Sequence, residues 1–183
     1  MTKTRLKIHD MVLCSLFAAV CCVLSTVTIP IGAVPVGFGI LAVVFTAAVL
    51  GPVRGFISVA VYLMLGLFLP LFSGGQNGFS AYPSHTGGYI WSYLLVALAV
   101  GALTRIKLKN KVLEAVMYSV FCFAGILICY VCGTAQFMLV TGYDLQSSLA
   151  ACIYPFVLFD IAKCVLTGMT APIIKSALSA HNI

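Results

Sequence analysis

Two long stretches without charge limit what this chain can fold into. From Met11 to Val53 it has 43 consecutive residues with no Asp, Glu, Lys or Arg, and from Gly55 to Thr104 it has 50. A membrane-spanning helix needs only about 20 apolar residues, so each stretch can hold two spans. The composition agrees, because 62% of the residues are hydrophobic and 8% are charged, against roughly 45 to 50% and 25% in soluble domains. The sequence therefore predicts an all-α integral membrane protein.

Prolines and glycines divide the chain into six helices of spanning length. The predicted helices run from about Met11 to Val27, Val36 to Leu50, Arg54 to Leu69, Tyr89 to Leu103, Val112 to Val140 and Leu145 to Leu178. Leu71 to Gly88 is too polar to face lipid and is predicted as a loop. Pro155 and Pro172 are candidate kinks in the last helix. We expect residues 1–183 to form one membrane-embedded domain.

The basic residues predict the orientation in the membrane. Nine of the ten Lys and Arg residues lie in the N-terminal tail, at Arg54, in the run from Arg105 to Lys111, and at Lys175. Six helices place all these positions on one side, and an excess of Lys and Arg marks the cytoplasmic side. We therefore expect a multi-pass protein of a cell membrane with both termini in the cytoplasm. Basic residues at the ends of apolar segments do not form a nucleic-acid footprint, so no nucleic-acid partner is expected.

Asp160 and Lys163 lie inside the last predicted helix. They are about 15 to 18 residues into it, which at 1.5 Å per residue is about 25 Å from its outer end, within the membrane. Each ionised group costs roughly 2.5 to 3.5 kcal/mol there, and such groups normally face protein or a water-filled cavity. A spacing of three puts both on one helix face. The pair could bind a polar ligand, or it could hold the helix against its neighbours.

A glycine-rich segment is the second candidate for a ligand site. It runs from Ser73 to Gly78 and continues at Thr86 to Tyr89. Glycines permit close backbone approach, and a Gly-Gly pair at the start of a helix leaves free N–H donors. The segment could fold over a ligand, or it could be a simple connector. Its candidate ligand contacts are Gln76, Asn77, Thr86, Gly87, Gly88, Tyr89 and Trp91.

Two of these candidates, Tyr89 and Trp91, are aromatic and have an alternative role. They could wall an apolar pocket, or they could belong to an aromatic belt at the membrane interface.

Small residues recur on one side of the first helix. Ser15, Ala18, Ala19 and Cys22 give the spacings Ser15 to Ala19 and Ala18 to Cys22, which allow close helix contact. They could pack within the bundle, or they could form a docking face for another membrane subunit.

The sequence contains no arrangement typical of an enzyme or a metal site. It has no paired carboxylates, no catalytic triad in a plausible site and no phosphate-binding loop. The eight cysteines lie in apolar stretches and are interpreted as small packing residues. We therefore expect no enzymatic activity, no cofactor and no metal.

Five motifs, taken in this order, resemble the BioY family. They are LGPVRGFIS at 50–58, YLMLG at 62–66, LPLFSGG at 69–75, TGGY at 86–89 and Asp160-x-x-Lys163. The resemblance extends from the first helix to the last. Two positions depart from the family pattern: Cys22 stands where alanine is expected, and Ser84-His85 stands where Gly-Pro is more frequent.

The resemblance implies a biotin-binding S component of an energy-coupling factor (ECF) transporter. In such a family the S component has six helices and binds biotin near the extracellular side. It docks on a transmembrane coupling subunit that carries two cytoplasmic ATPases, which supply the ATP hydrolysis. The resemblance also implies that Asp160 and Lys163 contact biotin, with Asn77 as a further contact, and that the small-residue face of the first helix is the coupling surface. The alternative is an S component for another vitamin, such as riboflavin or thiamine.

Overall fold

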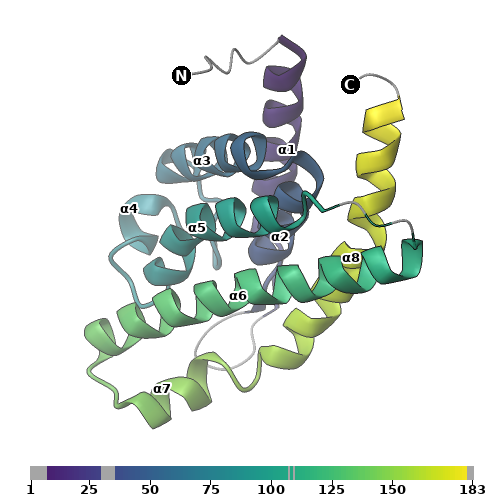
Figure 1. Ribbon diagram of the computed structural model, residues 1–183. Helices are drawn as coiled ribbons and strands as arrows, with labels where there is room; N and C mark the ends of the chain where they lie inside the picture. Colours follow the sequence, from purple (N-terminus) through teal and green to yellow (C-terminus); the bar gives the residue numbers. More distant parts are fainter. Residues whose placement is uncertain (1–7, 30–35, 107, 109, 181–183) are drawn as a thin grey trace, which may run out of the picture.

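The chain folds as a bundle of helices (Figure 1). The structure, a computed structural model, describes residues 8–29, 36–106, 108 and 110–180. The helices are α1 (Ile8–Thr26), α2 (Gly39–Leu50), α3 (Pro52–Phe68), α4 (Gly78–Ala81), α5 (Gly87–Leu103), α6 (Lys111–Thr141), α7 (Leu145–Cys152) and α8 (Val157–Ala180). Two short strands, β1 (Thr28–Ile29) and β2 (Val36–Gly37), complete the described elements.

The lengths and compositions of the helices agree with an integral membrane protein. Among the described helices, α1, α6 and α8 are long and apolar enough to cross a bilayer, with 19, 31 and 24 residues. The helices α2, α3 and α5 are also apolar but have only 12, 17 and 17 residues. The expectation of an all-α membrane fold is thereby confirmed.

Helix α2 occupies the centre of the bundle. It is apolar around its whole circumference, and such a helix is stable only when it is enclosed on all sides. It contacts α1, α3, α5 and α8. Small residues such as Ala42, Ala47 and Ala48 have no exposed surface and let these neighbours approach closely. The surrounding helices therefore shield α2, which at about 1.5 Å per residue is too short to span a bilayer on its own.

Charged side chains gather at one end of the bundle. A carboxylate oxygen of Asp10 in α1 lies 2.7 Å from the guanidinium of Arg54 in α3. The Lys175 ammonium of α8 donates a hydrogen bond to the carbonyl of Thr104, directly after α5. The beginnings of α1 and α3 and the ends of α5 and α8 therefore meet, as the charge pattern predicts.

The last predicted helix is divided, which corrects the prediction of one helix from Leu145 to Leu178. Helix α7 ends at Cys152, four residues of turn follow, and α8 begins at Val157. Pro155 lies in the turn, where its nitrogen has no hydrogen to donate and its ring would clash with the carbonyl four residues earlier. Helix α8 continues through the other proline, Pro172.

This break changes the position of the charged pair. Asp160 lies in the first turn of α8, so the predicted depth of about 25 Å inside one continuous helix was wrong. The pair is close to the end at which α8 begins, opposite to the end that carries Lys175.

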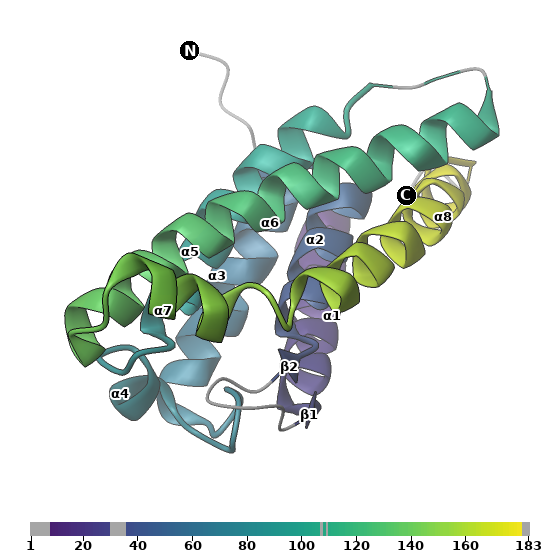
Figure 2. The ribbon, with the colours of Figure 1, turned by 90° about the horizontal axis from the view of Figure 1, so that it is seen from below.

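Two connections also differ from the sequence-based expectation. The link after α1 contains an antiparallel hairpin in which Thr28 pairs with Gly37 and Ile29 with Val36, so helix α2 begins at Gly39 and not at Val36. Figure 2 shows this hairpin beside the end of α1. The predicted loop from Leu71 to Gly88 contains the short helix α4, which is capped by the side chain of Asn77 through the amide of Ser80.

Candidate ligand-binding site

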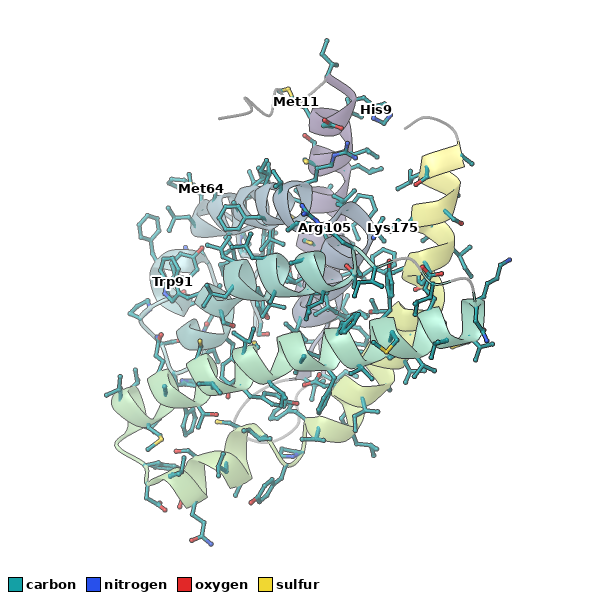
Figure 3. All side chains as sticks on the ribbon, viewed as in Figure 1. His9, Met11, Met64, Trp91, Arg105 and Lys175 are labelled. Atoms are coloured by element: carbon teal, nitrogen blue, oxygen red, sulfur yellow. The ribbon has the colours of Figure 1, made fainter. Side chains whose placement is uncertain are left out.

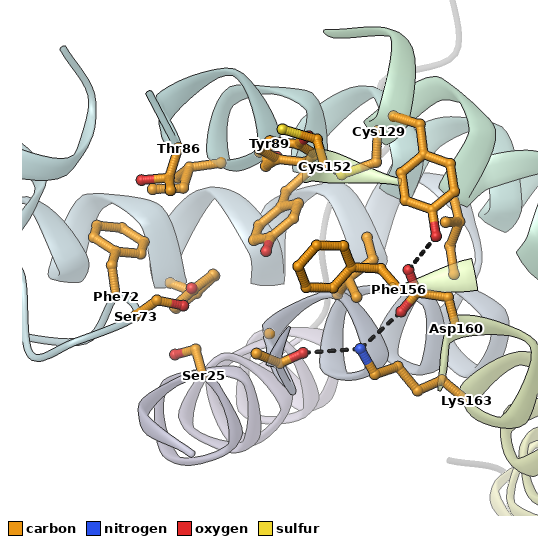
Figure 4. A pocket seen from close by; sticks show the side chains of 18 residues that line it. Ser25, Phe72, Ser73, Thr86, Tyr89, Cys129, Cys152, Phe156, Asp160 and Lys163 are labelled. Carbon is orange, nitrogen blue, oxygen red and sulfur yellow. Dashed lines mark hydrogen bonds and ion pairs between the residues drawn. The ribbon is translucent and has the colours of Figure 1, made fainter. Parts of the chain in front are cut away.

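A cavity of about 100 Å³ lies at the end of the bundle opposite to the charged cluster. It is formed where α1 ends, where α5 and α8 begin, and where the hairpin and the segment after α3 meet them (Figure 4). Its lining residues are Ser25, Gly37, Gly39, Ile40, Tyr62, Phe72, Ser73, Thr86, Tyr89, Ile90, Tyr93, Ile126, Cys129, Tyr130, Cys152, Phe156, Asp160 and Lys163. A single water needs about 10 to 15 Å³, so the space can hold part of an organic ligand.

Asp160 and Lys163 form a buried ion pair at one side of this cavity. The Lys163 ammonium lies 2.8 Å from Oδ1 of Asp160, and it also donates a hydrogen bond to the carbonyl of Gly37 at 3.0 Å. The Tyr130 hydroxyl donates to Oδ2 of Asp160 at 2.5 Å. Only 4% of Asp160 and 7% of Lys163 are exposed. Side chains and backbone of α6, α8 and β2 therefore meet at this pair.

The surroundings of the pair stabilise both charges. Removing two ions from water costs several kcal/mol each, and their attraction offsets this only when further hydrogen bonds satisfy the remaining atoms. Tyr130 supplies one such bond to the carboxylate and the Gly37 carbonyl supplies one to the ammonium. Asp160 also lies at the start of α8, where the helix dipole favours a negative charge.

The pair keeps hydrogen-bonding capacity for a ligand. An ammonium has three N–H groups, and a carboxylate has about four acceptor positions. The hydrogen bonds from Lys163 to Asp160 and Gly37, and from Tyr130 to Asp160, use only part of this capacity. Because both residues line the cavity, they can accept an N–H and donate to a carbonyl or carboxylate of a bound molecule.

The rest of the cavity is aromatic and aliphatic, with hydroxyl groups on the far side. Figure 4 shows Phe156 next to the charged pair, and Phe72, Ser73 and Thr86 at the opposite side. Apolar walls with a few placed polar groups are typical of small-molecule sites. The cavity therefore suits an elongated ligand with an apolar middle and two polar ends.

The structure places four of the sequence-predicted site residues in the lining of this cavity, namely Asp160, Lys163, Thr86 and Tyr89. Gly87 and Gly88 are buried beside it but do not line it. A Cβ atom on Gly87 would overlap the carbonyl of Tyr82, and one on Gly88 would overlap the carbonyl of Cys132. These glycines therefore allow the start of α5 to lie directly against α6.

Three other predicted residues also lie outside the lining. The Asn77 side chain accepts a hydrogen bond from the amide of Ser80 at 3.2 Å and so caps α4. Gln76 is exposed. Trp91 is 52% exposed on the outer face of α5 (Figure 3), where its ring lies 4.5 Å from that of Tyr82.

The small residues of α1 do not share one environment. Ser15 and Ala19 are exposed, Ala18 is buried, and Cys22 is half-buried. One of the two predicted spacings, Ser15 to Ala19, therefore lies on the outer surface, while Ala18 packs inside the bundle.

The sequence analysis missed two groups that hold the charged pair. Tyr130 has a detectable signal, because a tyrosine in an apolar helix normally needs a hydrogen-bond partner. The Gly37 carbonyl has no signal in the sequence, because every residue has a backbone carbonyl. Its position depends on the hairpin, which was not predicted.

Comparisons with known proteins agree with one another. The family model described as BioY family matches residues 1–180. A biotin transporter named BioY2 from Lactococcus lactis is 33% identical over 177 residues, covering 96% of this chain and 95% of the relative. A probable biotin transporter BioY from Pyrococcus horikoshii is 30% identical and covers 97% of this chain and 100% of the relative.

The fold is also that of a solved protein. A crystal structure of the S-component for biotin from an ECF-type ABC transporter matches with a TM-score of 0.80, at 24% identity, covering 98% of this chain and 95% of that one.

Removing one member of the charged pair should destabilise the protein more than removing both. Asp160→Asn leaves the Lys163 ammonium buried without its partner, and Lys163→Met does the same to the carboxylate. Each single change should cost about 3 to 5 kcal/mol, and the double variant should cost less than either single change. Thermal unfolding of the purified variants in detergent measures this.

Asp144→Asn is the matched control for the loss of one carboxylate. Asp144 caps α7 at the surface, and Asn is an equally good cap, so its unfolding midpoint should not change. A double variant in α8 that is less stable than either single variant would contradict the described pair.

Proposed function

The chain belongs to the BioY family, and we propose on this basis that it is the biotin-binding S component of an ECF transporter. The observation that carries the proposal is the cavity with the Asp160–Lys163 pair at one side, in a chain that matches biotin transporters over nearly its whole length. An S component for riboflavin or thiamine is not favoured, because the relatives are named as biotin transporters.

Biotin has the chemistry that the cavity requires. Its ureido ring has two N–H donors and one carbonyl, and its tail ends in a carboxylate, with apolar carbon and sulfur between them. Asp160 can accept from an N–H, and Lys163 can donate to an oxygen. The apolar walls suit the middle of the molecule, and the hydroxyls of Ser73 and Thr86 suit its other end.

Other predicted residues are proposed to act on biotin from the edge of the site. Asn77 follows a segment whose Phe72 and Ser73 already line the cavity, so a small movement of this segment would bring its amide, with Gln76, to the ligand. Tyr89 forms part of the cavity wall. Trp91 packs against Tyr82 and would stabilise this wall from the outer side. Gly87 and Gly88 keep this wall close to α6.

The proposed topology has six membrane-embedded helices, namely α1, α2, α3, α5, α6 and α8. The charged end, with Arg54, Arg105 and Lys175, would face the cytoplasm together with both termini, in accordance with the positive-inside rule. The cavity would then open toward the outside, where biotin is captured. In this proposal residues 1–183 form one substrate-binding domain that crosses the cell membrane several times.

The proposed partners supply the energy, because the chain itself is not an enzyme. A transmembrane coupling subunit with two cytoplasmic ATPases would dock on the S component, and ATP hydrolysis would drive its reorientation and the release of biotin. The outer face of α1 with Ser15 and Ala19 is the proposed docking surface, because small exposed residues allow close contact between helices. Ala18 and Cys22 would support this helix from the inner side.

Purified protein in detergent should bind labelled biotin at one site. Excess unlabelled biotin should displace the label, whereas riboflavin and thiamine should not, because neither combines N–H donors at one end with a carboxylate at the other. Equilibrium dialysis with each competitor measures this. No binding of labelled biotin by the parent protein, with labelled riboflavin or thiamine bound instead, would assign the chain to the alternative vitamin.

The role of Asn77 can be separated from its role as a helix cap. Asn77→Ser keeps a capping hydroxyl for α4 but removes the amide that would reach biotin. If Asn77 contacts biotin, this variant should bind more weakly, by about 3- to 10-fold for one lost hydrogen bond. Asn110→Ser is the matched control, because Asn110 caps α6 in the same way but is exposed and does not line the ligand cavity, and this variant should bind as the parent does. Parental affinity in Asn77→Ser would remove Asn77 from the site.

A further inference from the structure

A second cavity lies at the charged end of the bundle, far from the ligand site. It has a volume of about 370 Å³. Its lining includes the junction of α2 and α3, the first turn of α1 and the ends of α5 and α8. The lining residues are Asp10, Leu50, Gly51, Pro52, Val53, Arg54, Arg105 and Lys175.

This second cavity is strongly basic. Three cationic side chains line it, namely Arg54, Arg105 and Lys175, with only one carboxylate, that of Asp10. Asp10 pairs with Arg54 at 2.7 Å, so the four groups together carry a formal charge of +2. The positive-inside rule accounts for basic residues at this end of the helices, but it does not account for their convergence on a concave site.

Part of the basic cluster is held in place by the fold. The Lys175 ammonium donates hydrogen bonds to the Thr104 carbonyl at 2.7 Å and to the Tyr118 hydroxyl at 3.0 Å. Arg105 follows Thr104 directly in the chain, so this anchor joins the two segments that carry Arg105 and Lys175. Figure 3 shows both side chains in the space between the ends of α5 and α8. Lys175, and Arg54 through its pairing with Asp10, are therefore held in position before any ligand arrives.

The chemistry of the cavity fits a phosphate group. Guanidinium groups bind phosphate oxygens through two parallel hydrogen bonds, and an ammonium adds a point charge. Apolar residues also line the cavity, namely Leu50, Pro52 and Val53, and Val53 is 48% exposed. The phosphate group of a phospholipid can bind the basic side chains while its acyl chains contact the apolar residues. A free phosphate ion can bind only the basic side chains. Basic pockets between membrane helices on the cytoplasmic side are suited to anionic headgroups.

We propose that this basic cavity binds the phosphate of an anionic phospholipid. The proposal rests on the proposed membrane topology, since it requires the rim of the cavity to lie at the membrane surface. It does not rest on biotin, because the lipid site and the ligand site share no lining residue. The bound lipid would join the ends of α1, α3, α5 and α8 at one membrane surface.

Native mass spectrometry of the protein released from detergent micelles tests the proposal. Phosphatidylglycerol should bind as one saturable adduct at lower concentration than phosphatidylcholine. Millimolar inorganic phosphate should not displace it, because the acyl chains contribute to binding. Arg105→Gln should weaken the phosphatidylglycerol adduct about fivefold, the contribution of one basic residue near an anionic lipid.

Lys111→Gln is the matched control, because it removes one exposed basic residue from the first turn of α6 without changing the lining of the cavity. It should leave the adduct unchanged. Equal weakening by Arg105→Gln and Lys111→Gln would contradict a defined site, and so would equal binding of phosphatidylcholine. Displacement by inorganic phosphate would contradict a lipid as the ligand. Biotin binding, measured in the same samples, should be the same in both variants, and its absence from the parent would contradict the proposed function instead.

Discussion

The ion pair of Asp160 and Lys163 is the interaction on which the binding site depends. Two charges inside an apolar bundle are tolerated only when their partners are complete, and the structure supplies those partners from separate elements. Tyr130 of α6 holds the carboxylate, and the backbone of β2 at Gly37 holds the ammonium. A local requirement of two side chains therefore fixes the relative positions of α6, α8 and the hairpin at one end of the bundle.

The break at Pro155 and the pair belong to the same arrangement. Because the chain turns between α7 and α8, Asp160 falls in the first turn of a new helix, where the dipole favours a carboxylate. The same turn places Phe156 in the wall of the cavity. Arg54, Arg105 and Lys175 lie at the far end of the bundle, where they line a separate cavity. The two ends of the bundle therefore differ in their charged groups: one has a buried ion pair, and the other has a cluster of basic side chains.

Much of this organisation is predictable from sequence, for identifiable physical reasons. Charge-free stretches and prolines predict helices well, because few other structures are stable in lipid. A carboxylate close to an ammonium within such a stretch indicates a ligand-binding site. The sequence analysis missed the hairpin and α4, because both depend on tertiary contacts. It also missed the division of the last helix, because the sequence does not show whether a proline kinks a helix or ends it. Asn77 illustrates the limit: its residue type is consistent with both a ligand contact and a helix cap, and the structure shows the cap.

Binding of labelled biotin to the Asp160→Asn/Lys163→Met double variant tests the central claim most directly. The double variant leaves no unpaired buried charge, so it should stay folded and keep a cooperative thermal transition. Our account predicts that its affinity for biotin falls at least about 100-fold, because two charge-assisted hydrogen bonds are lost. A folded double variant with the parent's affinity would show that the pair only holds the helices together, and would contradict the site described above.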